Sequence, residues 1–188
     1  VLVEIDAEET PILDGSSRLY VEALQQAQLV RQPAEKKFFE VKKTTTFSLP
    51  EQNIQLRIEP ADDFQVFVEV DYNTKILSKQ VAELRNIEHF VPEIFQCRTF
   101  VFLHELQFLI QNNLVRGGDV DNAIVFVAQM PSHEVMQQLA QFFHKKDLKV
   151  TENGVLNNLE LHFPNEPARH KLLDLVGDLY LLGHAVKG

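Results

Sequence analysis

Cysteine is nearly absent from this chain of 188 residues, which contains only Cys97. A single cysteine excludes an internal disulfide framework and fits a reducing compartment, so we expect a cytoplasmic protein. Long apolar runs are absent as well. No stretch approaches the roughly 18 apolar residues that a membrane span requires, and we therefore expect no transmembrane segment.

Basic residues are in short supply. The chain has 18 Lys and Arg side chains against 27 Asp and Glu, which gives a formal charge of −9. This sign is wrong for a protein whose main task is to bind nucleic acid or an anionic membrane. The hydrophobic content of 45%, in contrast, is ordinary for a globular protein with a core. Composition therefore supports an acidic, soluble globular protein.

Hydrophobic periodicity in the first half of the chain predicts one helix followed by a strand-rich body. The first elements are, in order, a strand at 1–5, a turn at 11–17, an amphipathic helix at 17–30 and a linker at 31–36. Segments that alternate with period two follow at 37–49, 54–60 and 64–72. Because turn-rich residues separate the last two, we expect an antiparallel meander.

The second half alternates between strand and helix signals. The expected elements are a strand at 79–85, a helix at 87–96, a strand at 97–102, a helix at 103–114, a turn at 116–119, a strand at 122–128, a helix at 132–146, a hairpin at 148–163 and a final helix with Asn165 as its N-cap. The elements from 98 to 128 form a compact strand-helix-strand unit.

The final helix carries a group of residues that suggests chemistry. In "RHKLLDLVGDLY", His170, Asp174 and Asp178 are four residues apart and share one helix face. Imidazole nitrogen and carboxylate oxygen are both ligands that Zn²⁺ accepts. His170 and Asp174 would supply two ligands, and Asp178 either a third or an orienting carboxylate. The same spacing suits a simple surface ion pair, so spacing alone leaves both interpretations open.

Other candidates are weaker. Cys97 with a histidine would make a nucleophile pair, but nothing nearby in the sequence orients it, and a buried structural thiol is the better interpretation. "RGGD" at 116–119 lacks the lysine and serine of a phosphate-binding loop, which favours an ordinary turn. Asp14 and the other histidines have no spacing that forms a ligand set; these histidines are His89, His104, His133, His144, His162 and His184.

Four stretches taken together resemble one family in the right order. They are "PILDGSS", "CRTFVFLHELQFLI", "RGGDVDNAIVF" and "RHKLLDLVGDLYLLGH". They look like UDP-3-O-acyl-N-acetylglucosamine deacetylase, the zinc amidase that commits bacteria to lipid A synthesis. The resemblance extends from Val1 to Gly188 and includes the HKxxD and RTF motifs of the family. Four motifs in order are more specific than any one of them.

The resemblance implies roles for the residues of the final helix. His170 and Asp174 match two protein ligands of the catalytic zinc ion. Lys171 matches a lysine that contacts the UDP-3-O-acyl-N-acetylglucosamine substrate. Asp178 matches an aspartate that steadies a catalytic histidine.

The resemblance also implies a substrate pocket around the RTF motif. Thr99 matches a threonine that stabilises the oxyanion of the tetrahedral intermediate, and Phe100 a phenylalanine that packs near the sugar. The unit that follows resembles an insert that forms a passage for the fatty acyl chain. Its candidate lining residues are Leu106, Val115 and Val120.

Some family features lie outside these residues. The glutamate general base and the first zinc histidine belong to a motif upstream of Val1, and a second catalytic histidine to a segment beyond Gly188. We therefore expect the 188 residues alone to be inactive. Glu59 stands where some members carry a basic residue that faces the nucleotide diphosphate, which puts that contact in doubt. Residues 128–161 resemble the longer form in which the deacetylase is fused to a hydroxyacyl-carrier-protein dehydratase.

These arguments predict an α+β protein, built as a two-layer sandwich of sheet and helices with a strand-helix-strand insert. Residues 1–36 would be the tail of the first domain of the family and 37–188 most of its second, with the insert at about 98–128. The rival hypothesis is a non-catalytic binding or structural module. In that case the His170–Asp174 pair only stabilises packing.

Overall fold

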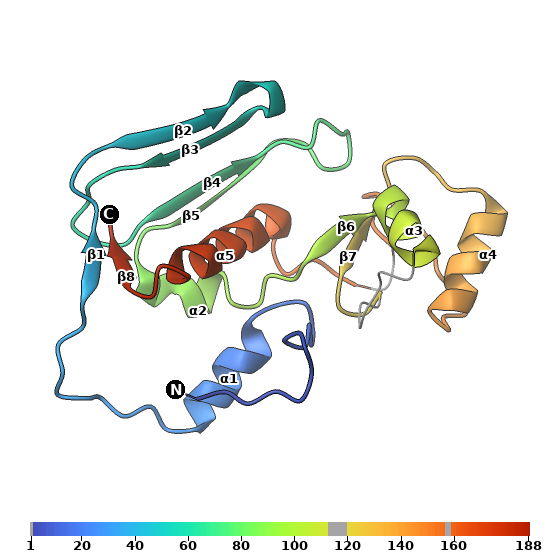
Figure 1. The fold of residues 1–188 in the computed structure, drawn as a ribbon. Coiled ribbons are helices and arrows are strands. Elements are labelled where there is room, and N and C mark those ends of the chain that lie inside the picture. Colours follow the sequence, from blue (N-terminus) through green and yellow to red (C-terminus); the bar gives the residue numbers. More distant parts are fainter. Residues whose placement is uncertain (1, 113–119, 157–158) are drawn as a thin grey trace.

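The computed structural model describes residues 2–112, 120–156 and 159–188, which form a mixed α+β fold (Figure 1). The helices are α1 (Arg18–Gln26), α2 (Phe90–Glu93), α3 (Leu103–Gln111), α4 (His133–Phe142) and α5 (Glu166–Tyr180), with short 3₁₀ helices at Pro50–Gln52 and Ile87–His89. The strands are β1 (Phe38–Glu40), β2 (Thr45–Leu49), β3 (Ile54–Ile58), β4 (Val66–Val70), β5 (Gln80–Leu84), β6 (Phe100–Phe102), β7 (Ile124–Phe126) and β8 (Ala185–Lys187). The predicted α+β class is confirmed. In the described ranges, every helix is too short or too polar to span a bilayer.

Helix α5 packs on the hairpin of β4 and β5, and this contact makes the main layer of helix on sheet (Figure 1). The two strands pair antiparallel, with Val66 opposite Leu84. Alternate side chains of each strand point to the helix, which is why period two predicted these strands. The buried cluster between the layers contains Val66, Ala82, Leu84, Ile94, Ala168, Leu172 and Val176. Burial of each Leu or Val side chain there stabilises the fold by roughly 1.5–3 kcal/mol.

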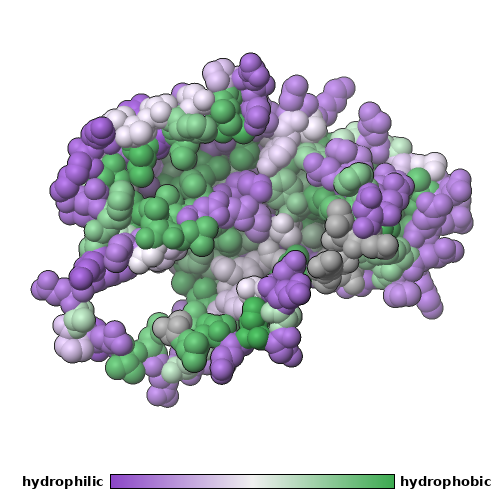
Figure 2. All heavy atoms as spheres, viewed as in Figure 1, coloured by the Kyte–Doolittle hydropathy of each residue, from purple (hydrophilic) through white to green (hydrophobic). Residues whose placement is uncertain are grey.

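The hairpin of β2 and β3 keeps an apolar face exposed. Its register places Phe47 opposite Leu56 and Leu49 opposite Ile54, so these four side chains share one face. They are between 38% and 56% exposed. Figure 2 shows apolar surface around this part of the molecule, interleaved with hydrophilic side chains. The hairpin therefore contributes little to the buried core.

Strands β1 and β8 bring the chain after α5 back beside the sheet. They pair parallel, with Phe38 opposite Ala185 and Glu40 opposite Lys187. The N–H of Gln65 donates to the carbonyl of Gly188 across 3.3 Å, just before β4 begins. Strand β8 was not predicted from the sequence.

A strand-helix-strand unit occupies the other end of the molecule (Figure 1). Strands β6 and β7 pair parallel, with Phe100 opposite Ile124. Helix α3 lies between them in the chain. The carboxylate of Glu105 accepts a hydrogen bond of 3.1 Å from the N–H of Phe102 at the start of α3. Helix α4 packs on the unit, and its Leu139 is buried in the same cluster as residues of α3 and β7. The predicted unit is confirmed.

The loop at 14–17 ties the N-terminal part of the chain to the segment before β6. The carboxylate of Asp14 accepts hydrogen bonds from the N–H and hydroxyl of Ser16 and from Nε of Arg18, at 2.8–3.2 Å. Partial burial alone would raise the pKa of Asp14, but these hydrogen bonds outweigh it and hold the pKa below its usual value. The N–H of Thr99 donates to the carbonyl of Gly15 across 2.7 Å.

The predicted strand at 1–5 is wrong for the described residues 2–5. These residues belong to no strand, and each of them is exposed. A strand needs a neighbour for its backbone hydrogen bonds, and among the described residues no neighbouring strand lies beside them. Alternation in the sequence therefore did not suffice.

Two further expectations need correction in detail. The strands from β2 to β5 form two separate hairpins, because the turn-rich connection at 59–65, with Pro60, does not hold β3 beside β4. The predicted hairpin at 148–163 is reduced in the described residues to one bridge, Val150 to Leu156, around a turn at Gly154. Val155 pairs with Phe126 instead. The predicted turn at 116–119 lies outside the described residues.

The conformation of Gly15 provides a test of the 14–17 loop. Its φ angle is +80°, and a Cβ atom added there would lie 1.8 Å from the carbonyl oxygen of Asn122. Because two backbone segments would have to separate, we expect Gly15→Ala to destabilise the chain by about 2 kcal/mol or more. Urea denaturation followed by circular dichroism measures this change.

Gly177→Ala is the matched control. Gly177 lies inside α5, and nothing stands within 4 Å of an added Cβ atom. Alanine is the better helix former, so this substitution should stabilise the chain by roughly 0.5–1 kcal/mol. Equal effects of the two substitutions would contradict the close contact of the 14–17 loop.

Candidate metal centre

Helix α5 begins at the predicted place. Pro167 stands in the first turn, where its missing N–H leaves no helical hydrogen bond unmade. Asn165 is the N-cap residue, as predicted, but its side chain makes no capping hydrogen bond. Its side chain instead donates to the carbonyl of Val81 across 2.7 Å and accepts from Nε of Arg169 across 2.9 Å. The bond to Val81 attaches the start of α5 to strand β5.

Four polar side chains follow one face of α5 at intervals of four residues. His170, Asp174 and Asp178 were singled out from the sequence, and Glu166 continues the same spacing toward the start of the helix. Glu166 is fully buried and His170 is 7% exposed. The side chain of Asp174 is 41% exposed and Asp178 is exposed. The face therefore opens toward solvent from its first residue to its last.

His170 and Asp174 are brought together. Nε2 of His170 lies 3.4 Å from Oδ1 of Asp174. Nδ1 of His170 lies 3.0 Å from the carbonyl oxygen of Cys97, which can only accept, so Nδ1 donates this bond. Burial lowers the pKa of His170, although the Cys97 carbonyl and Asp174 oppose this effect. Burial therefore favours the neutral form of the imidazole, and the hydrogen bond to Cys97 favours a proton on Nδ1.

Lys171 and Phe100 lie beside this pair. Nζ of Lys171 is 3.0 Å from Oδ2 of Asp174 and 5.5 Å from the centre of the Phe100 ring. The rings of Phe100 and His170 meet edge to face, with centres 6.4 Å apart. The structure thus collects a cation, an apolar ring, an imidazole and a carboxylate in one place. The roles of these residues in catalysis or binding remain proposals.

Arg98 and Glu166 form a buried ion pair that the sequence analysis missed. Oε1 of Glu166 accepts hydrogen bonds from the backbone N–H of Arg98 (2.9 Å) and from its Nε (3.0 Å). Oε2 accepts from the N–H of His162 (2.7 Å). The guanidinium group also donates to the carbonyl of Glu160. The pair joins the first turn of α5 to the residue before Thr99. The sequence did contain one indication of Glu166, because it stands four residues before His170 and continues the helical spacing of the polar residues.

Thr99 is positioned from two sides. Its N–H donates to the carbonyl of Gly15, and its carbonyl accepts from the N–H of Ile124 across 2.9 Å. Its backbone is therefore held between the 14–17 loop and β7.

Tyr72 is a second residue near the site that the sequence did not reveal. Its ring packs edge to face on Phe100, with centres 5.5 Å apart, and lies 5.6 Å from the ring of Phe102. Burial raises the pKa of Tyr72, and the charges of Lys171 and Asp174 also act on it. Tyr72 therefore forms an aromatic cluster with Phe100 and Phe102 beside the His170–Asp174 pair.

Cys97 is the structural thiol that was expected. It is fully buried, and desolvation, assisted by the charge of Glu166, raises the pKa of the thiol to about 12. A thiolate nucleophile is thus disfavoured at neutral pH. In the described part of the chain no group of three or more His, Cys, Asp or Glu side chains could hold a metal ion.

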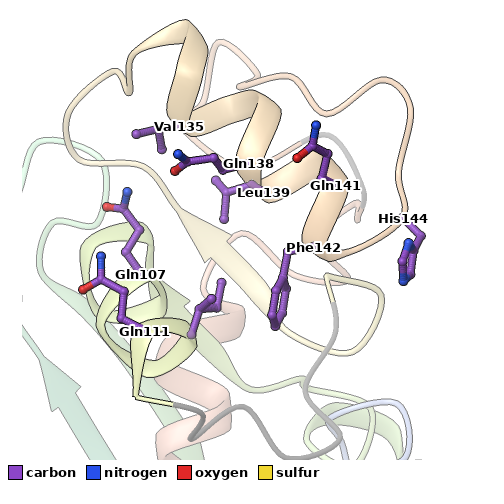
Figure 3. A pocket seen from close by; sticks show the side chains of 9 residues that line it. Gln107, Gln111, Val135, Gln138, Leu139, Gln141, Phe142 and His144 are labelled. Carbon is purple, nitrogen blue, oxygen red and sulfur yellow. The ribbon is translucent and has the colours of Figure 1, made fainter.

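Two candidates for the acyl passage lie in the core of the insert. Leu106 and Val120 are 6% and 0% exposed and pack in one cluster; Val115 lies outside the described residues. A cavity of about 570 Å³ opens nearby between α3 and α4, lined among others by Gln107, Ile110 and Phe142 (Figure 3). Its described lining does not include Leu106 or Val120. Their role in an acyl passage stays a prediction.

The chain matches the family model of UDP-3-O-acyl N-acetylglycosamine deacetylase (LpxC) over residues 1–146 and 137–188. It belongs to this deacetylase family. It is 41% identical over 187 residues to the bifunctional enzyme LpxC/FabZ of Porphyromonas gingivalis, a match that covers 100% of the chain and 40% of that protein. The bifunctional enzyme LpxC/FabZ of Chlorobaculum tepidum is 40% identical over 188 residues, covering 98% of the chain and 40% of that protein.

The chain is also similar to a relative that is named as a deacetylase alone. The UDP-3-O-acyl-N-acetylglucosamine deacetylase of Chromobacterium violaceum is 33% identical over 187 residues, covering 98% of the chain and 53% of that protein. The chain therefore spans between two fifths and about half of the length of these relatives. The resemblance to the deacetylase family, drawn from four motifs, is confirmed.

The ion pair of Arg98 and Glu166 leads to a test of stability. Arg98→Met leaves the buried Glu166 carboxylate without its cation, and we expect a loss of about 3–5 kcal/mol in the free energy of unfolding. Arg98→Met combined with Glu166→Leu removes both charges, so the loss should be smaller than for the single substitution. Urea denaturation of both variants gives the comparison.

Arg85→Met serves as the control for this deacetylase-family chain. Arg85 pairs with Glu83 at 3.1 Å, but the two side chains are 77% and 50% exposed. Such a surface pair contributes roughly 0–1 kcal/mol. If Arg98→Met changed stability no more than Arg85→Met, the buried pair would not be the anchor of α5.

Proposed function

We propose that these residues are part of a zinc-dependent deacetylase that hydrolyses the N-acetyl group of UDP-3-O-(3-hydroxyacyl)-N-acetylglucosamine, the committed step of lipid A synthesis. Membership of the deacetylase family supports the reaction class. One observation carries the assignment of the site: Nε2 of buried His170 faces Asp174 at 3.4 Å while Nδ1 is held by a backbone carbonyl. A histidine held in this way is typical of zinc sites.

The donor atoms fit zinc for two of its ligands. Zinc binds imidazole nitrogen and carboxylate oxygen at about 2.0–2.2 Å in tetrahedral sites, which separates neighbouring ligand atoms by roughly 3.4 Å. The distance of 3.4 Å between Nε2 of His170 and Oδ1 of Asp174 agrees with this value. The described residues supply no third side chain. By the family resemblance, a histidine upstream of Val1 completes the set.

The residues of the chain have distinct parts in the proposed reaction. When bound, zinc supplies a Lewis acid that polarises the amide carbonyl and lowers the pKa of a water molecule. The hydroxyl of Thr99 donates a hydrogen bond to the oxyanion. Lys171 offers its ammonium group to an anionic part of the substrate, and the ring of Phe100 offers apolar contact to the sugar. Asp178 orients a catalytic histidine.

The remaining proposals concern the surroundings of the reaction. The unit of β6, α3 and β7 receives the acyl chain, and Leu106, Val115 and Val120 are its candidate contacts. The parent protein is cytoplasmic, in keeping with a free, buried Cys97. The names of the bifunctional relatives support a parent protein in which a dehydratase is fused to the deacetylase.

A longer protein that contains these residues together with the upstream histidine-bearing segment and a downstream glycine-histidine segment tests the site. We expect His170→Ala and Asp174→Ala each to lower kcat/KM for deacetylation by more than about 100-fold and to reduce zinc content. His89→Ala is the control, because His89 is 55% exposed and faces Glu93 at 3.7 Å on α2. Zinc content and activity that survive both substitutions would argue against a zinc site at His170 and Asp174.

The 188 residues on their own test the completeness of the site. Because two ligands and no general base are present, we expect the purified chain to show no zinc-dependent release of acetate from the UDP-sugar. A coupled acetate assay with added zinc measures this. Deacetylation that a chelator abolishes would refute this expectation.

A further inference from the structure

We propose that Glu166 is a positioning residue for His170. Acting through the peptide plane between Cys97 and Arg98, it keeps the imidazole proton on Nδ1 and the lone pair on Nε2. The use of this lone pair for zinc rests on the proposed function. The protonation pattern of the ring is a separate property that can be measured without zinc or substrate.

One peptide plane connects the two side chains. The C=O of Cys97 and the N–H of Arg98 belong to the same rigid peptide unit. Its N–H donates to Oε1 of Glu166 at 2.9 Å, and its C=O accepts from Nδ1 of His170 at 3.0 Å. Glu166 and His170 stand four residues apart on α5, so one helix face holds both edges of the plane. Rotation of this plane would break both hydrogen bonds.

The carboxylate of Glu166 is itself held in a fixed position. It is fully buried, and its two oxygens accept hydrogen bonds from the backbone N–H groups of Arg98 and His162 and from the Arg98 side chain. A buried carboxylate with several donors has little freedom to move. The plane is further fixed before Cys97, whose N–H donates to the carbonyl of Ile94 at 2.9 Å.

Two acceptors compete for the single proton of the neutral imidazole, one at each ring nitrogen. Oδ1 of Asp174 lies 3.4 Å from Nε2, and a carboxylate there attracts a proton to Nε2. A proton on Nε2 would occupy the lone pair that a metal ion requires. The Cys97 carbonyl, at 3.0 Å, draws the proton to Nδ1 instead. By fixing that carbonyl, Glu166 settles the competition in favour of Nδ1.

Two variants separate positioning from stability. Arg98→Met removes the cation but leaves the Glu166 carboxylate to accept from the backbone N–H of residue 98. Arg98→Met with Glu166→Leu replaces the buried ion pair by apolar side chains, which is often tolerated, but it also removes the acceptor of the N–H groups of residue 98 and His162. If Glu166 has a purely structural role, the position of the proton on the His170 ring should change with the loss of stability in each variant. If Glu166 positions His170, the proton should move only when the Glu166 carboxylate is removed.

The readout is the two-bond ¹⁵N–¹H correlation spectrum of the histidine rings in the 188-residue chain at slightly alkaline pH. In the natural chain and in folded Arg98→Met, we expect His170 to be protonated on Nδ1. In the double variant we expect the major form to carry its proton on Nε2. A double variant that keeps the natural pattern, or a folded Arg98→Met that loses it, overturns the proposal.

The natural chain can overturn the proposal by itself, even if neither variant folds. A His170 ring that carries its proton mainly on Nε2 would exclude the hydrogen bond on which the inference depends.

Zinc affinity of the longer protein provides the link to function, and the double variant should lower it by about 10- to 100-fold. If the ring pattern changes as expected while the longer protein binds no zinc, the positioning role stands and the proposed function fails. If zinc binds and the double variant leaves both ring pattern and affinity unchanged, the positioning role fails and the proposed function stands.

Discussion

The burial of the Glu166 carboxylate is the constraint on which the arrangement of the site depends. A charge removed from water needs a cation and hydrogen-bond donors, and Arg98, its own backbone N–H and the N–H of His162 supply them. Such a pair adds little net stability compared with apolar packing, so its effect lies in what it holds together. It joins the first turn of α5 to the segment that leads into β6, 68 residues earlier in the chain. The neighbours of that junction are Thr99 on the strand side and His170 one helical turn later.

Helix α5 serves two purposes on two faces. Ala168, Leu172 and Val176 are four residues apart and pack on β4 and β5. The polar series that starts at Glu166 has the same spacing but is displaced by two residues, which turns it by about 200° to the other side of the helix. Apolar burial therefore fixes the helix on the sheet, while the polar face reaches the segment before β6 and the aromatic group around Phe100. The site is built where the main layer meets the strand-helix-strand unit.

Local patterns predicted much of the fold and part of the site. Alternation found the strands that pack on α5, and helical spacing placed His170 and Asp174 on one face, because both signals arise from neighbouring residues. The contacts of Arg98 and Tyr72 depend on segments distant in the sequence, and no local period reports them. The strand expected at 1–5 failed for the same reason, since pairing needs a partner that alternation does not specify. The resemblance to the deacetylase family supplied the proposed roles of Thr99 and Lys171, which neither composition nor spacing contains.

The central claim is that the polar face of α5 is half of a zinc site. Anomalous diffraction at the zinc absorption edge, from crystals of a longer protein that contains these residues, tests it most directly. The account predicts one strong peak at about 2.0–2.2 Å from both Nε2 of His170 and a carboxylate oxygen of Asp174. A bound zinc ion that contacts neither residue would contradict it.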